Sequence, residues 1–149
     1  DIIDRKEVEE IIDKAIADGY TTFISGCAMG VDIWAGQIVI RKKADNSGLH
    51  LIAAVPWTGF SKRWSVDWQV EYDELLRGAD LVKTVCYHYH DGVFQQRNEW
   101  MVDHSNRVIA YFNGAAGGTK NTIDYAKNKG IEVVVNNPDT DTKKPLEAL

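Results

Sequence analysis

Apolar residues in the first part of the chain return every three or four positions, with charged residues between them. Over residues 4–18, the apolar face carries Val8, Ile11, Ile12, Ala15 and Ile16, and this period predicts an amphipathic helix. Gly19 follows it, as glycine commonly follows a helix. With four further segments, the predicted helices cover residues 4–18, 31–43, 66–76, 94–104 and 119–129.

Short, apolar runs rich in β-branched residues lie between these segments. Such runs predict strands whose two faces are both covered. We expect the second strand to end at Pro56, because proline lacks the N–H that a strand ladder needs. The predicted strands cover residues 21–25, 49–55, 81–86, 107–112 and 131–135.

Helices and strands therefore alternate, which predicts right-handed crossovers and a mostly parallel sheet. The fold class is α/β: a Rossmann-like three-layer sandwich with a sheet of about five strands. We expect one domain over residues 1–137 and a polar tail over residues 138–149. Ligands of such sheets bind beyond the carboxyl ends of the strands. The loops predicted at that edge are residues 25–32, 56–64, 86–93 and 113–119.

The composition and net charge of the chain argue against several classes of protein. The chain has 149 residues, a net charge of −5 and a sequence pI of about 5.3, which argues against a protein that coats nucleic acid with a basic surface. Two cysteines are too few for a disulfide scaffold. No apolar run reaches the roughly 18 residues of a membrane span. We expect a cytoplasmic protein without a membrane or an extended nucleic acid as partner.

The most informative loop runs from Asn113 to Thr122, between a predicted strand and a predicted helix. Gly117 and Gly118 let the main chain approach a ligand closely. The free N–H groups and the dipole of the following helix favour a phosphate there. Thr119 and Asn121 add a hydroxyl and an amide. The loop predicts a nucleotide-type ligand, although Asn113 is also an ordinary turn residue.

A second glycine turn spans residues 25–32 and includes Ser25, Gly26 and Gly30. It also leads from a strand into a helix, which suits a ligand that lies on the start of that helix. Asp32 either interacts with the helix dipole, accepts ribose hydroxyls or polarises a water. The structural alternative is equally strong, because tight turns between strand and helix often need glycine.

Arg97 and its neighbour Asn98 lie near the start of a predicted helix. From there Arg97 can reach the ligand edge and hold a phosphate through two hydrogen bonds. The alternative is a surface arginine paired with Glu99 or Asp103. A positive charge at a helix N-terminus is unfavourable, because that end of the helix dipole is itself positive. The position of Arg97 therefore favours a specific function.

Aromatic residues gather after the second predicted strand, where Trp57, Phe60, Trp64 and Trp68 follow one another closely. Such rings either stack on a base or cover a core edge or a subunit interface. We expect ligand contact from Trp57, which directly follows the strand end, and core or interface packing from Trp68.

The sequence gives little support for a metal site or for a nucleophilic triad. His88, His90 and Asp91 share a loop, but this pattern without cysteine partners is a weak zinc signal. The serines lack the Gly-x-Ser-x-Gly elbow of a nucleophilic triad. We therefore expect no metal and no cofactor.

Three blocks carry a resemblance to a known family: residues 24–35, residues 96–110 and the glycine loop at residues 117–122. Together they resemble the YpsA-like branch of the SLOG superfamily, which also holds the Lonely Guy phosphoribohydrolases and the DprA-type Rossmann domains. The resemblance covers residues 4–135. It implies a Rossmann-like sheet that binds nucleotides or their ribose-phosphate derivatives.

The resemblance also bears on catalysis. In Lonely Guy enzymes the second loop reads Pro-Gly-Gly-x-Gly-Thr-x-x-Glu, and Gly117 and Gly118 match its paired glycines. Lys120 and Asn121 replace the Gly-Thr, and Asp124 stands at the catalytic Glu. The family usually opens with a strand and a Gly-x-Arg-Pro turn. Either these lie upstream of Asp1, or the site is reduced.

These patterns leave three functions open. The first is a sensor or sequestering protein that binds a nucleotide, ADP-ribose or a cyclic relative of it. The second is a nucleoside monophosphate N-glycosidase, in which Asp32 or Asp124 stabilises the oxocarbenium ion or activates water. The third is an interaction protein with a vestigial pocket. From the family and the aromatic residues we also expect a homo-oligomer, either a dimer or a tetramer.

Overall fold

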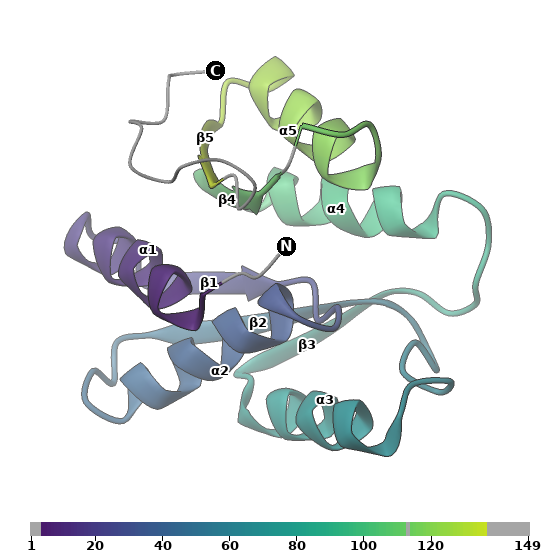
Figure 1. Cartoon of the computed structure of the whole chain (residues 1–149), viewed down its shortest axis with the longest axis horizontal. Coiled ribbons are helices and arrows are strands. Elements are labelled where there is room, and N and C mark those ends of the chain that lie inside the picture. The colour runs from purple at the N-terminus through teal and green to yellow at the C-terminus, as the bar shows by residue number, and fades with distance from the viewer. Residues whose placement is uncertain (1–3, 113, 137–149) are drawn as a thin grey trace.

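Helices and strands alternate along the chain in the computed structural model, which describes residues 4–112 and 114–136 (Figure 1). The helices are α1 (Arg5–Ala17), α2 (Val31–Lys43), α3 (Val66–Gly78), α4 (Val93–Asp103) and α5 (Gly118–Asn128). The strands are β1 (Thr22–Ser25), β2 (His50–Trp57), β3 (Leu81–Cys86), β4 (Arg107–Tyr111) and β5 (Glu132–Asn136). The predicted polar tail at residues 138–149 lies outside the described residues, as does Asn113.

The predicted elements are confirmed, with one informative difference at the end of β2. This strand continues through Pro56, and Val55 and Trp57 on either side of the proline pair with Thr84 and Cys86 of β3. Residues face alternate sides of a strand, so the nitrogen of Pro56 points toward β1. The pairing with β1 has already ended at Ala53. Proline is tolerated here because no partner on that side needs its N–H.

The strands form two parallel sheets, with the order β1-β2-β3 in one and β4-β5 in the other. The α/β class and the parallel pairing were expected, whereas the division of the sheet was not. Arg107 at the start of β4 forms an ion pair with Asp18 at 2.8 Å and lies 4.7 Å from the ring centre of Tyr20, just before β1. The amino ends of β1 and β4 therefore lie side by side.

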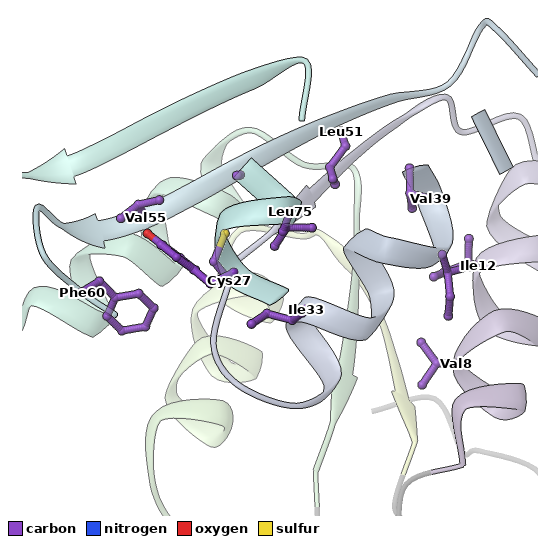
Figure 2. Packing of buried hydrophobic residues seen from close by; sticks show 12 residues of the cluster. Val8, Ile12, Cys27, Ile33, Val39, Leu51, Val55, Phe60 and Leu75 are labelled. Atoms are coloured by element: carbon purple, nitrogen blue, oxygen red, sulfur yellow. The ribbon is translucent and has the colours of Figure 1, made fainter. Parts of the chain in front are cut away.

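The larger core lies between the three-stranded sheet and the helices α1, α2 and α3, as Figure 2 shows for its labelled residues. Ile33 of α2, Leu51 of β2 and Leu75 of α3 are almost fully buried. Each such side chain contributes about 1.5–3 kcal/mol of hydrophobic stabilisation. A smaller cluster of Ala110, Ile123 and Val135 joins β4, β5 and α5. Each sheet thus carries its own core.

Gly36 allows the close approach of α2 and α3. A Cβ atom at this position would overlap the buried side chain of Leu75. Overpacking of this kind costs about 1–3 kcal/mol, and the gain in helix propensity offsets roughly 1 kcal/mol of it. We expect Gly36→Ala to lower the free energy of unfolding, measured by urea denaturation, by about 1 kcal/mol.

Gly48→Ala is the matched control for this prediction. A Cβ at Gly48 would meet only the Asn46 side chain, at 3.3 Å, in a surface turn. Its expected change is within about 0.5 kcal/mol. Equal stabilities of the two variants would show that α2 and α3 can separate without loss.

Candidate functional site

A cavity of about 1200 Å³ lies between β1 and β4 and opens onto the starts of α2, α4 and α5. It is larger than most small-molecule pockets, which measure about 300–1,000 Å³. Many of the residues predicted from the sequence as a binding site line this cavity. They are Ser25, Gly26, Gly30, Asp32, Arg97, Asn98, Gly118 and Thr119. Four other predicted residues do not line it: Trp57, Gly117, Asn121 and Asp124.

The first glycine turn is held by hydrogen bonds of its own residues. The Ser25 hydroxyl donates to the carbonyl oxygen of Asp32 at 2.7 Å and accepts from the backbone N–H of Cys27 at 3.2 Å. The N–H of Ala28 donates to the Asp32 carboxylate at 3.4 Å. Cys27 is fully buried with a φ of 64°, a backbone conformation that non-glycine residues rarely adopt. Hydrogen bonds among its own residues therefore define the shape of this turn.

Arg97 is buried, with 6% of its surface exposed, and holds this turn from α4. Its Nη1 donates to the carbonyl oxygen of Gly26, and its Nε donates to the Asn98 side chain at 2.8 Å. The alternative of a surface arginine paired with Glu99 or Asp103 is wrong. Glu99 accepts instead from Gln95 at 3.0 Å, and Asp103 pairs with Lys129 at 2.7 Å.

The side chains of Asp32 and Arg97 both lie close to Gly26. A Cβ at Gly26 would lie 2.8 Å from Oδ2 of Asp32 and 3.1 Å from Cζ of Arg97. Burial raises the pKa of the Asp32 carboxyl group, and the positive charge of Arg97 acts against that rise. Burial lowers the pKa of Arg97, and Asp32 acts against that fall. The site thus combines a fixed cation with a hydrogen-bond acceptor, and glycine is the residue that fits between them.

Three helices start at this cavity without a capping side chain. The helices α1 and α3 begin with Asp4 and Ser65, whose side chains accept from backbone N–H groups of the first turn. In contrast, the helices α2, α4 and α5 follow a glycine and have no side-chain cap. The first N–H groups of a helix need acceptors and carry a partial positive charge. Such helix starts are suited to an anion, and those of α2 and α5 belong to the two glycine turns.

One part of the second glycine loop lines the cavity, and the residues that follow lie on the surface. Gly118 and Thr119 line the cavity, and a Cβ at Gly118 would find no atom within 4 Å. Lys120 and Asp124 pair with each other at 2.7 Å on the exposed face of α5. Asn121 is also exposed. The structure brings Asp32 to the cavity but leaves Asp124 outside it, so the catalytic role of Asp124 stays a prediction.

Trp57 does not line the cavity, but it contacts the ring of Phe94, which does. Its ring meets those of Phe60, Tyr89 and Phe94 edge to face, at centroid distances of 5.1, 5.1 and 5.4 Å. Phe94 lines the cavity, and Arg97 lies 5.8 Å from its ring centre. Sequence reasoning missed Phe94, although its place one helical turn before Arg97 was a usable signal. Contact of Trp57 with a ligand stays a prediction.

Cys27 offers a simple test of this packing. Burial raises the pKa of its thiol to about 12, and its side chain is fully inaccessible. Because the thiolate is the reactive form, we expect an aromatic disulfide reagent at about pH 8 to modify Cys86 alone in the folded chain. Both thiols should react in denaturant, and Cys86→Ser should leave the folded chain unreactive. Rapid modification of Cys27 in the native state would contradict the described turn.

Within residues 4–112 and 114–136, no three His, Cys, Asp or Glu side chains gather in a group that could hold a metal ion. No helix in these ranges has the length and apolar character needed to cross a membrane.

Comparison with known proteins gives one family match and several relatives. The family model YpsA, described as the YspA SLOG family, matches residues 2–135. The SPbeta prophage-derived protein YoqJ of Bacillus subtilis is 31% identical over 132 residues, which are 80% of this chain and 75% of YoqJ. UPF0398 proteins of Staphylococcus saprophyticus and Staphylococcus aureus are 25% and 22% identical over 111 residues. These alignments cover 73% of this chain but only 59% and 57% of the two relatives.

Proposed function

Because the chain belongs to the YspA SLOG family, we propose that its cavity binds a nucleotide or an ADP-ribose-type molecule, as a sensor or a sequestering protein. Membership of this family suggests a nucleotide-related function. The names of these relatives specify no ligand or activity. The choice of ligand therefore rests on the chemistry of the cavity.

The observation that carries the proposal is the convergence of three anion-favouring features on one cavity. The starts of α2 and α5 both lack a capping side chain. The buried Arg97 lines the same cavity and adds a permanent positive charge. A single glycine turn occurs in many folds for structural reasons, but two such turns and a buried cation are suited to a phosphate or diphosphate group.

The proposal assigns a role to each group of residues. The N–H groups after Gly30 and Gly117 bind phosphate oxygens, and Arg97 provides the countercharge. Asp32 accepts hydrogen bonds from ribose hydroxyls, because its carboxylate lies beside the first turn and cannot favour a phosphate itself. Phe94 lines the cavity and offers an apolar face for the base, with Trp57 behind it.

Isothermal titration calorimetry against a panel of nucleoside mono- and diphosphates, ADP-ribose and cyclic ADP-ribose tests the proposal. We expect at least one member to bind with a Kd of about 1–100 μM, which corresponds to roughly 5–8 kcal/mol. The affinity should fall as salt is added, because the phosphate contacts are electrostatic. The absence of binding by every member would reject the proposal.

A second function is supported by Asp32 alone. An N-glycosidase needs a carboxylate near the glycosidic bond, and Asp32 lies at the cavity with a pKa raised by burial. Chromatography of products separates this enzyme from a binding protein. Recovery of intact nucleotide after long incubation would support the binding function. Free base that forms with the wild type and not with Asp32→Asn would support the enzyme.

A further inference from the structure

Arg97 fixes the orientation of the neighbouring Asn98 side chain, and both residues line the cavity. The Nε–H group of Arg97 donates to the side chain of Asn98 at 2.8 Å. Because a guanidinium group can only donate, the atom of Asn98 that accepts this bond is the carbonyl oxygen Oδ1. The amide group of Asn98 cannot turn over without loss of the bond. Its Nδ2 therefore points away from Nε of Arg97.

Each of these two residues keeps a donor group that no described residue accepts. Arg97 uses Nε for Asn98 and Nη1 for the carbonyl oxygen of Gly26, which leaves Nη2 without an acceptor in residues 4–112 and 114–136. Nδ2 of Asn98 also has no acceptor in these ranges. Neither atom is among the buried side-chain atoms that lack a partner, so both are accessible. The exposed 6% of Arg97 therefore includes Nη2.

The positive charge of Arg97 has no direct countercharge in the described part of the chain. Arg97 forms no ion pair with any described residue, although the charge of Asp32 acts on it from nearby. A buried cation without a paired anion is unfavourable. Asn98 adds N–H donors beside this cation and no charge of its own.

The chemistry of these free groups selects the kind of ligand atom that they bind. Nη2 of Arg97 and Nδ2 of Asn98 can donate but cannot accept. A phosphate oxygen is a pure acceptor, and its negative charge also compensates that of Arg97. A hydroxyl group can accept a hydrogen bond, but it is neutral and leaves the charge of Arg97 uncompensated. The two residues are therefore better suited to an ionised phosphate than to a sugar hydroxyl.

We propose that Asn98 is a specificity-determining residue that selects ligands with an ionised phosphate group. Its Nδ2 donates to one phosphate oxygen, and Nη2 of Arg97 donates to another, beside the glycine turn that Arg97 holds through Gly26. Arg97 thus binds the phosphate and also orients the amide of Asn98. This inference rests on the proposed function. It adds that the cavity distinguishes a nucleotide from the corresponding nucleoside through the donors of Asn98.

Nuclear magnetic resonance with inorganic pyrophosphate tests the contact directly. The side-chain amide signal of Asn98 is identified by its disappearance in Asn98→Asp. We expect this signal to shift as pyrophosphate is added to the wild-type protein, and adenosine, which has no phosphate, should not reproduce the shift. The side-chain amide of Gln96 is the internal control, because Gln96 is exposed on α4 and does not line the cavity. Its signal should stay in place.

Asn98→Asp separates ligand binding from stability. Aspartate has the same size and still accepts from Nε of Arg97, so the thermal midpoint of unfolding should not fall. It replaces the Nδ2 donor with an acceptor and neutralises Arg97, so the affinity for pyrophosphate should fall by at least about 10-fold. Gln96→Glu makes the same change of charge outside the cavity, and its affinity should stay within about twofold of wild type.

The outcomes distinguish this proposal from the proposed function. If the wild type binds a nucleotide of the panel but the Asn98 signal does not respond to pyrophosphate, the role of Asn98 is overturned and the proposed function stands. Equal affinities of wild type and Asn98→Asp, or equal losses in Asn98→Asp and Gln96→Glu, would also overturn that role. A response of Asn98 to pyrophosphate without binding of any nucleotide would support the phosphate contact and reject the proposed function.

Discussion

Replacement of Arg97 by methionine is expected to lower the free energy of unfolding by about 3 kcal/mol. Methionine has a similar length but no charge and no donors. The carbonyl oxygen of Gly26 loses its hydrogen bond from Nη1, and Asp32 loses the positive charge beside it. A buried carboxylate without a compensating charge is costly. Urea denaturation of both proteins measures the difference.

The loss of stability in Arg97→Met should depend on pH, and the direction of that dependence identifies Asp32 as its source. The pKa of Asp32 is raised in the folded chain by burial, and the loss of Arg97 removes the main opposing effect. A raised folded pKa means that the folded state binds a proton more readily than the unfolded state. Stability relative to wild type is therefore lost as the pH rises and regained as it falls. We expect a smaller deficit at about pH 5 than at about pH 7.

Two controls make this prediction specific. Arg77 is exposed and forms none of the described ion pairs, so Arg77→Met should change stability by less than about 0.5 kcal/mol. The double variant Arg97→Met with Asp32→Asn should recover part of the loss, because a neutral amide needs no countercharge. A deficit that is independent of pH and unchanged in the double variant would show that Arg97 stabilises the turn only through its bond to Gly26.

The elements could be predicted from the sequence because their signals are local. The apolar period of α1 and the β-branched runs of the strands specify which face is buried, and they do so within a few neighbouring residues. The end of β2 differed because it depends on a distant residue. Pro56 is accommodated only because β1 has already ended at Ser25, and no pattern around the proline carries that information.

In the site, too, nearby sequence identified some residues, whereas the positions of others depend on distant parts of the chain. Local sequence patterns were enough to choose several residues that the cavity brings together. They are Gly26, Gly30, Asp32, Arg97 and Gly118. The side on which a helical residue lies depends on how the helix is rotated against its sheet. That rotation leaves Asp124 paired with Lys120 on the surface and brings Phe94 to the cavity. The division of the sheet depends on pairing partners far apart in sequence.

Gly118→Ala is expected to reduce ligand affinity by about 10- to 100-fold without loss of stability. Its φ lies outside the left-handed region, and a Cβ would meet no atom within 4 Å, so the folded chain has room for it. Alanine at the start of α5 should even add up to about 1 kcal/mol through helix propensity. The empty space in front of Gly118 is part of the cavity, where a phosphate oxygen would approach the uncapped N–H groups.

The measurement is a calorimetric titration with whichever nucleotide of the panel binds the wild type. Loss of one or two hydrogen bonds to a charged group costs about 1.5–3 kcal/mol, which gives the expected change in affinity. Gly48→Ala, at a surface turn outside the cavity, should bind as the wild type does. Unchanged ligand affinity in Gly118→Ala would show that the phosphate does not bind at the start of α5. The start of α2 would then remain as its site. Because the variant folds normally in either case, the result separates binding from stability.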